Sequence, residues 1–362
     1  MSAKTCDAVV IGGGIAGVSV AAELATSMDV VLVEREAQLA YHTTGRSAAL
    51  YFGSYGHSST LPLTAASRAW FDDPEFTDAP VLAPRGALTV AFDGAPVPDL
   101  LGAEQLGPDE AADLVPVLDR ARLTGAAYER GAADMDVAAI HQAFVRKLRH
   151  HRGEVRTTAP VTGLERNDET WTVQSGSERI TAAVVVNAAG AWADEVARLA
   201  GAEPIGIQPR RRTAFMVTAP PSSEHWPMVT DAGHTFYFKP DGVQLLCSPA
   251  DETPSPPVDA RPEEVDIALA IERINAVTDL GIRSVRSAWA GLRTFAPDGG
   301  MALGFDAGVD GFFWLAGQGG TGIQTAPASA RLAAGLIQSG SVPDDLPSID
   351  LAALDPARFG RR

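Results

Sequence analysis

The stretch CDAVVIGGGIAGVSVAAELA, residues 6–25, constrains the fold of this chain more than any other segment. A β-branched strand runs into Gly12, Gly14 and Gly17, and an alanine-rich helix follows. The spacing is typical of a dinucleotide-binding turn: the first glycine permits the tight turn, the second admits a pyrophosphate, and the third lets helix and strand pack closely. The next strand, DVVLVERE, ends in Glu34, where a carboxylate accepts hydrogen bonds from ribose hydroxyls. The sequence therefore predicts a Rossmann-like nucleotide-binding domain.

Strand–turn–helix patterns recur further along the chain, at residues 182–201 and 311–337. A turn rich in Thr, Gly and Ser at residues 42–51 contains Arg46, and its hydroxyls and backbone donors can meet a pyrophosphate from the opposite side. Three strand–turn–helix units spread over the sequence indicate one cofactor domain that is interrupted by insertions. We expect a dinucleotide to lie extended across all three units.

Charge and cysteine content exclude several classes of function. The 45 Asp and Glu residues outnumber the 29 Lys and Arg residues, and the formal net charge is −16. Binding of a phosphate backbone needs clustered basic residues, so we expect no nucleic-acid partner. Cys6 and Cys247 show no metal-type spacing, which predicts neither a disulfide nor a metal site. No apolar run is long enough for a transmembrane helix, so we expect a cytoplasmic protein, with peripheral attachment at the inner membrane as the alternative.

These motifs resemble those of the FAD-dependent amino-acid oxidase and dehydrogenase superfamily, which includes glycine oxidases and D-amino-acid dehydrogenases. The segments that carry the resemblance are GGGIAG with Glu34, GRSAA, NAAGAW and GQGGTGIQT. Within the superfamily, YHTTGRSAALY, LTAASRAWFD, QPRRRTAFMV, FYFKPD and WAGLRTF look most like the bacterial D-arginine dehydrogenase branch. The resemblance implies an FAD cofactor rather than NAD. It also implies non-covalent binding, because neither cysteine lies in the GLRTFAPDGG segment where some relatives attach the flavin.

The resemblance also implies which residues contact the cofactor. They gather in the glycine turn, at the end of the second strand, in the 42–51 turn, at one backbone position near the adenine, and in the two later turns. The expected cofactor contacts are Gly12, Gly14, Ile15, Ala16, Gly17, Glu34, Arg35, Thr43, Thr44, Gly45, Arg46, Ser47, Ala48, Ala49, Leu50, Val161, Ala189, Gly190, Trp192, Gly319, Gly320, Thr321, Gly322 and Ile323.

The expected fold class is an α/β flavoprotein of two domains. A Rossmann-like FAD-binding domain comprises residues 1–80, 130–205 and 288–345, and a substrate-binding domain with a mixed, largely antiparallel sheet comprises residues 81–129 and 206–287. Residues 346–362 form a C-terminal tail, and the chain after Ser341 is expected to be a loose extension. Helices are expected over residues 61–73, after Pro108, over residues 134–153 and over residues 262–278, and residues 81–97 alternate like a hairpin.

A flavin that oxidises an amino acid needs the substrate carboxylate fixed, and the planar guanidinium of arginine does this with two parallel hydrogen bonds. In the strand RRRTAFMV, alternation places Arg210 and Arg212 on one face and Arg211 on the other. The resemblance assigns Arg212 to the substrate site, Arg293 to the carboxylate clamp, and Tyr237 to a further donor; these three are the expected catalytic residues. Arg210 and Arg211 are expected to be solvated surface charges.

The resemblance places Tyr55, Gly320, Leu50, Ala87 and Thr321 at the substrate as well. Gly320 is expected to offer its carbonyl to the substrate ammonium group. Leu50, Ala87 and Thr321 depart from the D-arginine dehydrogenase pattern. In that pattern a histidine stands at Leu50, an acidic residue near Ala87, and a tyrosine at Thr321. An unpaired guanidinium would be costly to bury there. We therefore predict oxidation of a D-amino acid with a neutral or apolar side chain to an imino acid, which hydrolyses to a 2-oxo acid and ammonia.

Three alternatives stay open at this point. The carboxylate clamp would serve a secondary amine such as sarcosine or proline, or a 2-hydroxy acid, equally well. A non-catalytic flavin subunit of a larger complex is the third. The electron acceptor is a quinone-like molecule or oxygen, and no motif separates an oxidase from a dehydrogenase.

Overall fold

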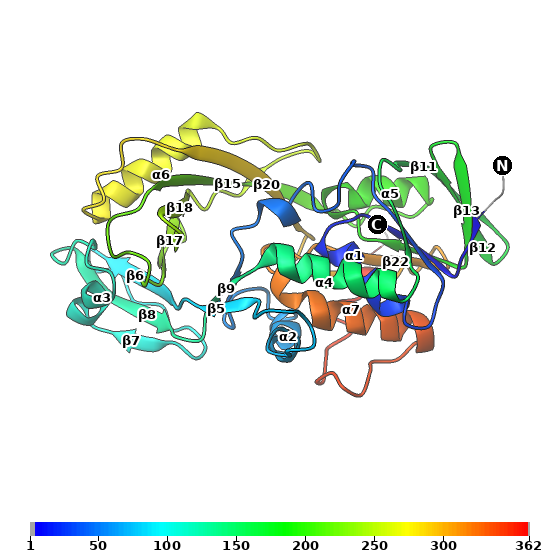
Figure 1. The fold of residues 1–362 in the computed structure, drawn as a ribbon, viewed down its shortest axis with the longest axis horizontal. Coiled ribbons are helices and arrows are strands. Elements are labelled where there is room, and N and C mark those ends of the chain that lie inside the picture. Colours follow the sequence, from blue (N-terminus) through cyan, green and yellow to red (C-terminus); the bar gives the residue numbers. More distant parts are fainter. Residues whose placement is uncertain (1–3, 361–362) are drawn as a thin grey trace.

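The computed structural model describes residues 4–360. Two regions can be distinguished in it, and the first is built on a six-stranded sheet (Figure 1). The central strands are rich in valine and buried on both faces, as is typical of parallel strands between covering layers. In spatial order the strands are β10 (Glu154–Arg156), β3 (Val30–Val33), β2 (Ala8–Ile11), β14 (Val184–Asn187), β22 (Phe312–Ala316) and β21 (Ala302–Phe305). All neighbours are parallel except β21, which runs antiparallel to β22.

Helices cover one face of this sheet. Helix α1 (Ile15–Leu24) packs against α4 (Val137–His150) and α7 (Gly322–Ser339), and Figure 1 shows the three together beside β22. The helix predicted over residues 134–153 is confirmed as α4, which begins at Val137: the carboxylate of Asp136 accepts a hydrogen bond from the backbone N–H of Ala139 at 2.8 Å and caps the helix. These helices and the sheet enclose the larger part of the buried apolar core.

The other face of the six-stranded sheet is covered by α5 (Ala193–Leu199) and by a four-stranded sheet. That sheet contains, in order, β1 (Lys4–Thr5), β13 (Glu178–Ala182), β12 (Thr170–Ser175) and β11 (Val161–Asn167). Between the two sheets lie the fully buried rings of Trp171, Phe312 and Trp314. The strands therefore have an apolar layer on each side.

The second region is a nine-stranded sheet. Its order is β19 (Thr253–Pro254), β15 (Gln208–Thr218), β18 (Gln244–Ser248), β17 (Tyr237–Asp241), β16 (Met228–Asp231), β6 (Ala87–Phe92), β8 (Leu123–Glu129) and β7 (Glu104–Leu106), and β20 (Ser287–Phe295) pairs with β15. Only β16 and β6 are parallel, so the predicted mixed, largely antiparallel sheet is confirmed. Helices α3 (Pro108–Leu114) and α6 (Glu264–Val277) cover its outer face, over Phe215 and Phe238.

The predicted hairpin over residues 81–97 is wrong. The first part of that segment forms β5 (Leu82–Pro84), which pairs with β9 (Ala133–Met135) in a three-stranded sheet that also contains β4 (Leu50–Tyr51). The second part forms β6, which belongs to the nine-stranded sheet. The chain changes sheets at Arg85, whose guanidinium is held by Asp134 at 2.6 Å and by the carbonyl of Trp226 at 3.2 Å. The predicted helix at 61–73 is confirmed as α2 (Leu61–Phe71).

The C-terminal segment packs on the region that contains the six-stranded sheet, so the expectation of a loose extension is wrong. The side chain of Leu354 is completely buried, and its carbonyl accepts a hydrogen bond from the N–H of Leu303 at 2.8 Å. The short 3₁₀ helix η3 (Pro356–Phe359) follows, and Arg358 in it forms an ion pair with Asp298 at 2.8 Å. Two buried leucines, Leu346 and Leu354, and the Arg358–Asp298 ion pair hold this segment against the rest of the protein.

We expect Leu354→Ala to lower the free energy of unfolding by about 3 kcal/mol, because the change removes a fully buried leucine side chain and leaves a cavity. Chemical denaturation of Leu354→Ala and of the wild type measures this difference. Leu351→Ala is the matched control, since Leu351 lies in the same segment with 36% of its surface exposed. Equal stability of the two variants would contradict the packing described for this segment.

Candidate cofactor and substrate site

The turn between β2 and α1 requires its glycines for steric reasons. Gly12 has a φ of +113°, and a Cβ atom there would collide with the carbonyl oxygen of Ala188. A Cβ on Gly17 would collide with the carbonyl of Gly12. His141, buried on α4, supports the turn from below, since its Nε2 lies 3.0 Å from the carbonyl oxygen of Gly13. The turn is therefore a rigid cradle that opens toward a cavity.

A cavity of about 390 Å³ extends from this turn to the nine-stranded sheet. Most of the residues expected from the sequence form its wall. They are Gly12, Gly14, Ile15, Ala16, Glu34, Arg35, Thr43, Thr44, Arg46, Ser47, Ala48, Val161, Ala189, Gly190, Trp192, Arg212, Tyr237, Arg293, Gly319, Gly320, Gly322 and Ile323. Segments that are far apart in the sequence thus meet around one elongated space.

Seven expected residues lie outside the wall of the cavity: Gly17, Gly45, Ala49, Leu50, Tyr55, Ala87 and Thr321. Gly17 and Gly45 are needed for backbone packing, because a Cβ on either would collide with a carbonyl. Leu50 is drawn into β4 and Ala87 into β6, where each pairs with a neighbouring strand. The hydroxyl of Thr321 donates to the carbonyl of Gln318 at 2.8 Å just before α7 begins. Direct contact of these residues with cofactor or substrate stays a prediction, and Tyr55 reaches the site through Arg293, as described below.

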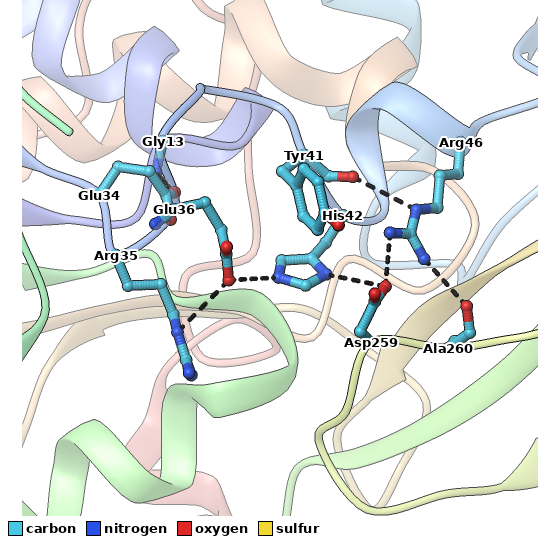
Figure 2. A network of polar contacts seen from close by, with 9 residues as sticks. All are labelled: Gly13, Glu34, Arg35, Glu36, Tyr41, His42, Arg46, Asp259 and Ala260. Carbon is cyan, nitrogen blue, oxygen red and sulfur yellow. Dashed lines mark hydrogen bonds and ion pairs between the residues drawn. The ribbon is translucent and has the colours of Figure 1, made fainter. Parts of the chain in front are cut away.

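The acidic end of the cavity lies at Glu34. Its two carboxylate oxygens accept backbone hydrogen bonds from Gly13 at 2.6 Å and from Glu36 at 2.9 Å, which Figure 2 shows at the glycine turn. A carboxylate oxygen has more than one lone pair, so Glu34 can accept further bonds from the cavity side. Arg35 stacks over the indole of Trp192, with its guanidinium carbon 5.2 Å from the ring centroid. This end suits a ribose and its flat base.

Arg46, in the 42–51 turn, lines the cavity, and its contact with the cofactor stays a prediction. Its guanidinium is bound by the protein: Nη2 lies 2.5 Å from Asp259, Nη1 donates to the carbonyl of Ala260 at 3.0 Å, and Nε donates to the carbonyl of Tyr41 at 3.2 Å (Figure 2). Nη1 also donates to the carbonyl of Ala290 at 3.0 Å. Its partners lie more than 200 residues away in the sequence, apart from Tyr41. Arg46 still lines the cavity, and its role in the structure is to fasten the wall.

The other end of the cavity holds Arg212, Arg293 and Tyr237. Strand alternation was predicted correctly, because Arg210 and Arg212 bind the two oxygens of the same carboxylate, that of Glu252, at 2.7 and 3.1 Å. Arg212 also donates to the carbonyl of Asp251 at 2.7 Å. Arg293 lies across β15 and β20 from Arg210, so it projects from the same face. The pairing of the two strands thus presents two guanidinium groups to one end of the cavity.

The charges of these two guanidiniums are incompletely balanced by the protein. Burial and the neighbouring charge of Arg293 lower the pKa of Arg212. Burial also opposes ionisation of Arg293, but Tyr55, Tyr237 and Glu252 outweigh it and raise its pKa. Arg293 donates to the hydroxyl of Tyr55 at 3.0 Å, and it forms no ion pair within residues 4–360. A substrate anion placed here would relieve the repulsion between the two cations.

Arg211 is not the solvated charge that the sequence suggested. Only 13% of its side chain is exposed, and it forms ion pairs with Glu263 and, at 2.7 Å, with Asp266 on the far side of the sheet. Arg210 has 39% of its side chain exposed and lies over the ring of Phe295, so it is closer to the expected surface role. The three consecutive arginines therefore have three different environments.

The loop that carries Tyr55 is fixed by two buried side chains that sequence reasoning missed. The amide of Gln324, on α7, accepts from the N–H of Phe52 at 3.1 Å and donates to the carbonyls of Phe52 and Tyr55. Glu129, on β8, accepts from the N–H of Gly53 at 2.6 Å and from the hydroxyl of Ser54 at 2.5 Å. Gln324 lies in the GQGGTGIQT motif, which was a usable signal, whereas nothing local marked Glu129.

The fold and the cavity define a Rossmann-like dinucleotide-binding protein, and comparison with known proteins gives its family. The family model DAO, described as "FAD dependent oxidoreductase", matches residues 7–336. The chain therefore belongs to this family of FAD-dependent oxidoreductases, and its cofactor is FAD. The helices among residues 4–360 are each too short or too polar to cross a membrane.

Individual relatives share about a fifth to a quarter of their residues with this chain. Mitochondrial dimethylglycine dehydrogenase from Mus musculus is 25% identical over 394 residues, covering 98% of this chain and 44% of that protein, so the chain spans less than half of this relative. The structure of L-proline dehydrogenase from P. horikoshii has a TM-score of 0.85 at 22% identity, covering 99% and 98% of the two chains. That of glycine oxidase from Geobacillus kaustophilus has a TM-score of 0.83 at 21% identity, covering 98% and 99%. These structures confirm the predicted fold class.

The residues present fit FAD. Gly14 lines the cavity, and the only atom that a Cβ there would approach is the hydroxyl oxygen of Thr44, so the backbone is open to a phosphate. The N-termini of α1 and α7 both lie at the wall and provide N–H groups with no partner inside their helices. Glu34 lies at the opposite end from the arginine pair. The cavity thus offers an acceptor for ribose, helix ends for phosphate, and a cationic end for substrate.

We expect the stability of the protein to fall on acidification, in part through His141. Burial lowers the pKa of His141 from 6.5, so the unfolded chain binds a proton that the native state rejects. The free energy of unfolding should therefore decrease as the pH falls below about 6.5, with a slope of at most about 1.4 kcal/mol per pH unit from this one group. His141→Gln keeps a donor for Gly13 but does not titrate, so it should show a shallower decrease between pH 7 and pH 5. His225→Gln, at an exposed position, is the control, and an unchanged slope in His141→Gln would contradict the assignment.

Proposed function

We propose that the protein oxidises a free α-amino acid of D configuration with a neutral or apolar side chain. The observation that carries the proposal is the pair Arg212 and Arg293 at one end of the FAD cavity, where Arg293 lacks an ion-pair partner among residues 4–360. Two guanidiniums can hold a carboxylate in a fixed orientation, and a carboxylate next to the reacting carbon is the shared feature of amino-acid substrates.

The residues around the cavity divide the work. Arg293 and Arg212 bind and orient the substrate carboxylate, and the phenol of Tyr237, which also lines this end, adds a donor. The carbonyl of Gly320 accepts a hydrogen bond from the substrate amine. When bound, FAD would accept a hydride from the α-carbon of the substrate. The neutral amine would thereby become an iminium, which water hydrolyses to a 2-oxo acid and ammonium. The N-terminus of α7, at Gly322, favours negative charge at the neighbouring edge of the cavity.

The proposed neutrality of the side chain rests on what surrounds the substrate end. Ala48 and Ala214 line it, and Leu50 and Ala87 beyond them bring no charge. Glu129 on β8 lies directly across from Ala87 on β6. Both of its carboxylate oxygens already accept hydrogen bonds from Gly53 and Ser54. A cationic side chain would be left without a partner.

A second candidate is an N-methylated or cyclic amino acid. The observation that favours it is the match over 98% of the chain to a dimethylglycine dehydrogenase. The arginine pair would hold the carboxylate of such a substrate in the same way, and only the amine would differ.

Anaerobic mixing of the purified flavoprotein with a panel of substrates separates these candidates. We expect D-leucine, D-methionine and D-phenylalanine to bleach the flavin absorbance faster than their L-forms and faster than D-arginine. Faster bleaching by sarcosine, N,N-dimethylglycine or proline would support the second candidate instead. Faster turnover of D-arginine would contradict a neutral substrate, and a flavin that none of these compounds reduces would contradict amino-acid oxidation altogether.

Replacing the clamp arginines tests the carboxylate site directly. We expect Arg212→Met and Arg293→Met each to lower kcat/KM by roughly 30-fold, equivalent to about 2 kcal/mol, because each change removes charge-assisted hydrogen bonds. FAD should remain bound, as the flavin spectrum will show. Arg210→Met is the matched control from the same strand, since Arg210 does not line the cavity. Unchanged kinetics in both clamp variants would rule out a carboxylate held by these arginines.

A further inference from the structure

Residues 255–261, SPPVDAR, connect β19 to α6 and reach from the nine-stranded sheet to the wall of the FAD cavity. We call them the proline segment. Val258 and Ala260 line a small space behind that wall, together with His42, Thr43 and Arg46, which also line the main cavity. The proline segment therefore backs the part of the wall formed by residues 41–46.

One carboxylate in the proline segment binds two residues of that wall. An oxygen of Asp259 lies 2.5 Å from Nη2 of Arg46 and 4.0 Å from Nδ1 of His42 (Figure 2). The other ring nitrogen of His42 lies 3.1 Å from Glu36, next to the expected ribose position at Glu34. Figure 2 shows these groups as one chain of polar contacts from Arg35 to Arg46. Asp259 is the member of this chain that the nine-stranded region contributes.

Both ends of the proline segment are fastened to β15. Upstream, Thr253 and Pro254 pair with Arg211 and Arg210, and the N–H of Ser255 donates to the carbonyl of Pro209 at 3.0 Å. Downstream, Glu263 forms an ion pair with Arg211. The segment is thus held against the strand that carries Arg212, and it cannot swing away from the cavity wall without breaking these contacts.

We propose that the proline segment is a clasp that retains FAD, with Asp259 as its positioning residue. Tyr41–Thr44 and Arg46 line the cavity, and FAD release by outward movement of this part of the wall is the step that the clasp slows. Outward movement separates Arg46 and His42 from Asp259, and the clasp therefore raises the barrier to release. Because the ion pair is partly exposed, its effect on the release rate is modest, about fivefold. The clasp acts on cofactor retention and is independent of which substrate is oxidised.

The rate of FAD release from the holoenzyme tests the clasp, measured as the rise of free-flavin fluorescence after dilution. We expect Asp259→Asn to release FAD about five times faster than the wild type at low ionic strength. Asp345→Asn is the matched control, because Asp345 also forms an exposed ion pair with an arginine, at 3.0 Å, but lies in the C-terminal segment. Its release rate should equal that of the wild type. High salt should reduce the difference in release rate between Asp259→Asn and the wild type, because ions screen the Asp259–Arg46 ion pair.

Release from Asp259→Asn at the wild-type rate, at low salt, would overturn the proposal. Equal acceleration in Asp345→Asn would also overturn it, because the effect would then be general. If Asp259→Asn purifies without flavin, its apoprotein is reloaded with FAD and the release rate is measured in the same way. A rate about five times that of the wild type supports the clasp, and the wild-type rate contradicts it.

Discussion

The antiparallel pairing of β15 with β20 is the contact on which the site depends. It runs from Gln208 opposite Phe295 to Met216 opposite Ser287, and it sets Arg293 and Arg212 on one face of the sheet. The same β20 continues to the cofactor loop, where the carbonyl of Thr294 accepts a hydrogen bond from Gly319 at 2.8 Å. A shift of one residue would turn the arginines to the opposite face. Substrate clamp and cofactor loop are therefore positioned by one strand pair.

Electrostatic pairing distinguishes arginines that look alike in the sequence. In an acidic chain most guanidiniums find a carboxylate: Arg46 binds Asp259, and Arg211 binds Glu263 and Asp266. These residues fasten segments together. Arg293 instead meets the hydroxyl of Tyr55 beside the second cation, Arg212. A buried cation without an internal counterion favours an anionic ligand, and this sets Arg293 apart from the structural arginines.

The expectations that failed share one physical cause, which is that the deciding partner lies far away in the sequence. Arg211 looked like a surface charge because its partners, Glu263 and Asp266, are more than 50 residues away. Residues 81–97 looked like a hairpin because nothing local shows that Arg85 is bound by Asp134 and that β5 pairs with β9. Glu129 was missed for the same reason. Strand alternation and the glycine turn, which depend on neighbouring residues, were predicted correctly.

The sequence by itself determined the dinucleotide turn, the acid at Glu34 and the alternation of Arg210 and Arg212, because backbone sterics and strand geometry are local. The tertiary structure alone decided which arginine is left for a ligand. Burial and the distribution of counterions made Arg211 a structural cation and left Arg293 facing the cavity. Those quantities depend on segments that are far apart in the sequence and meet only in the folded protein, so no local pattern contains them.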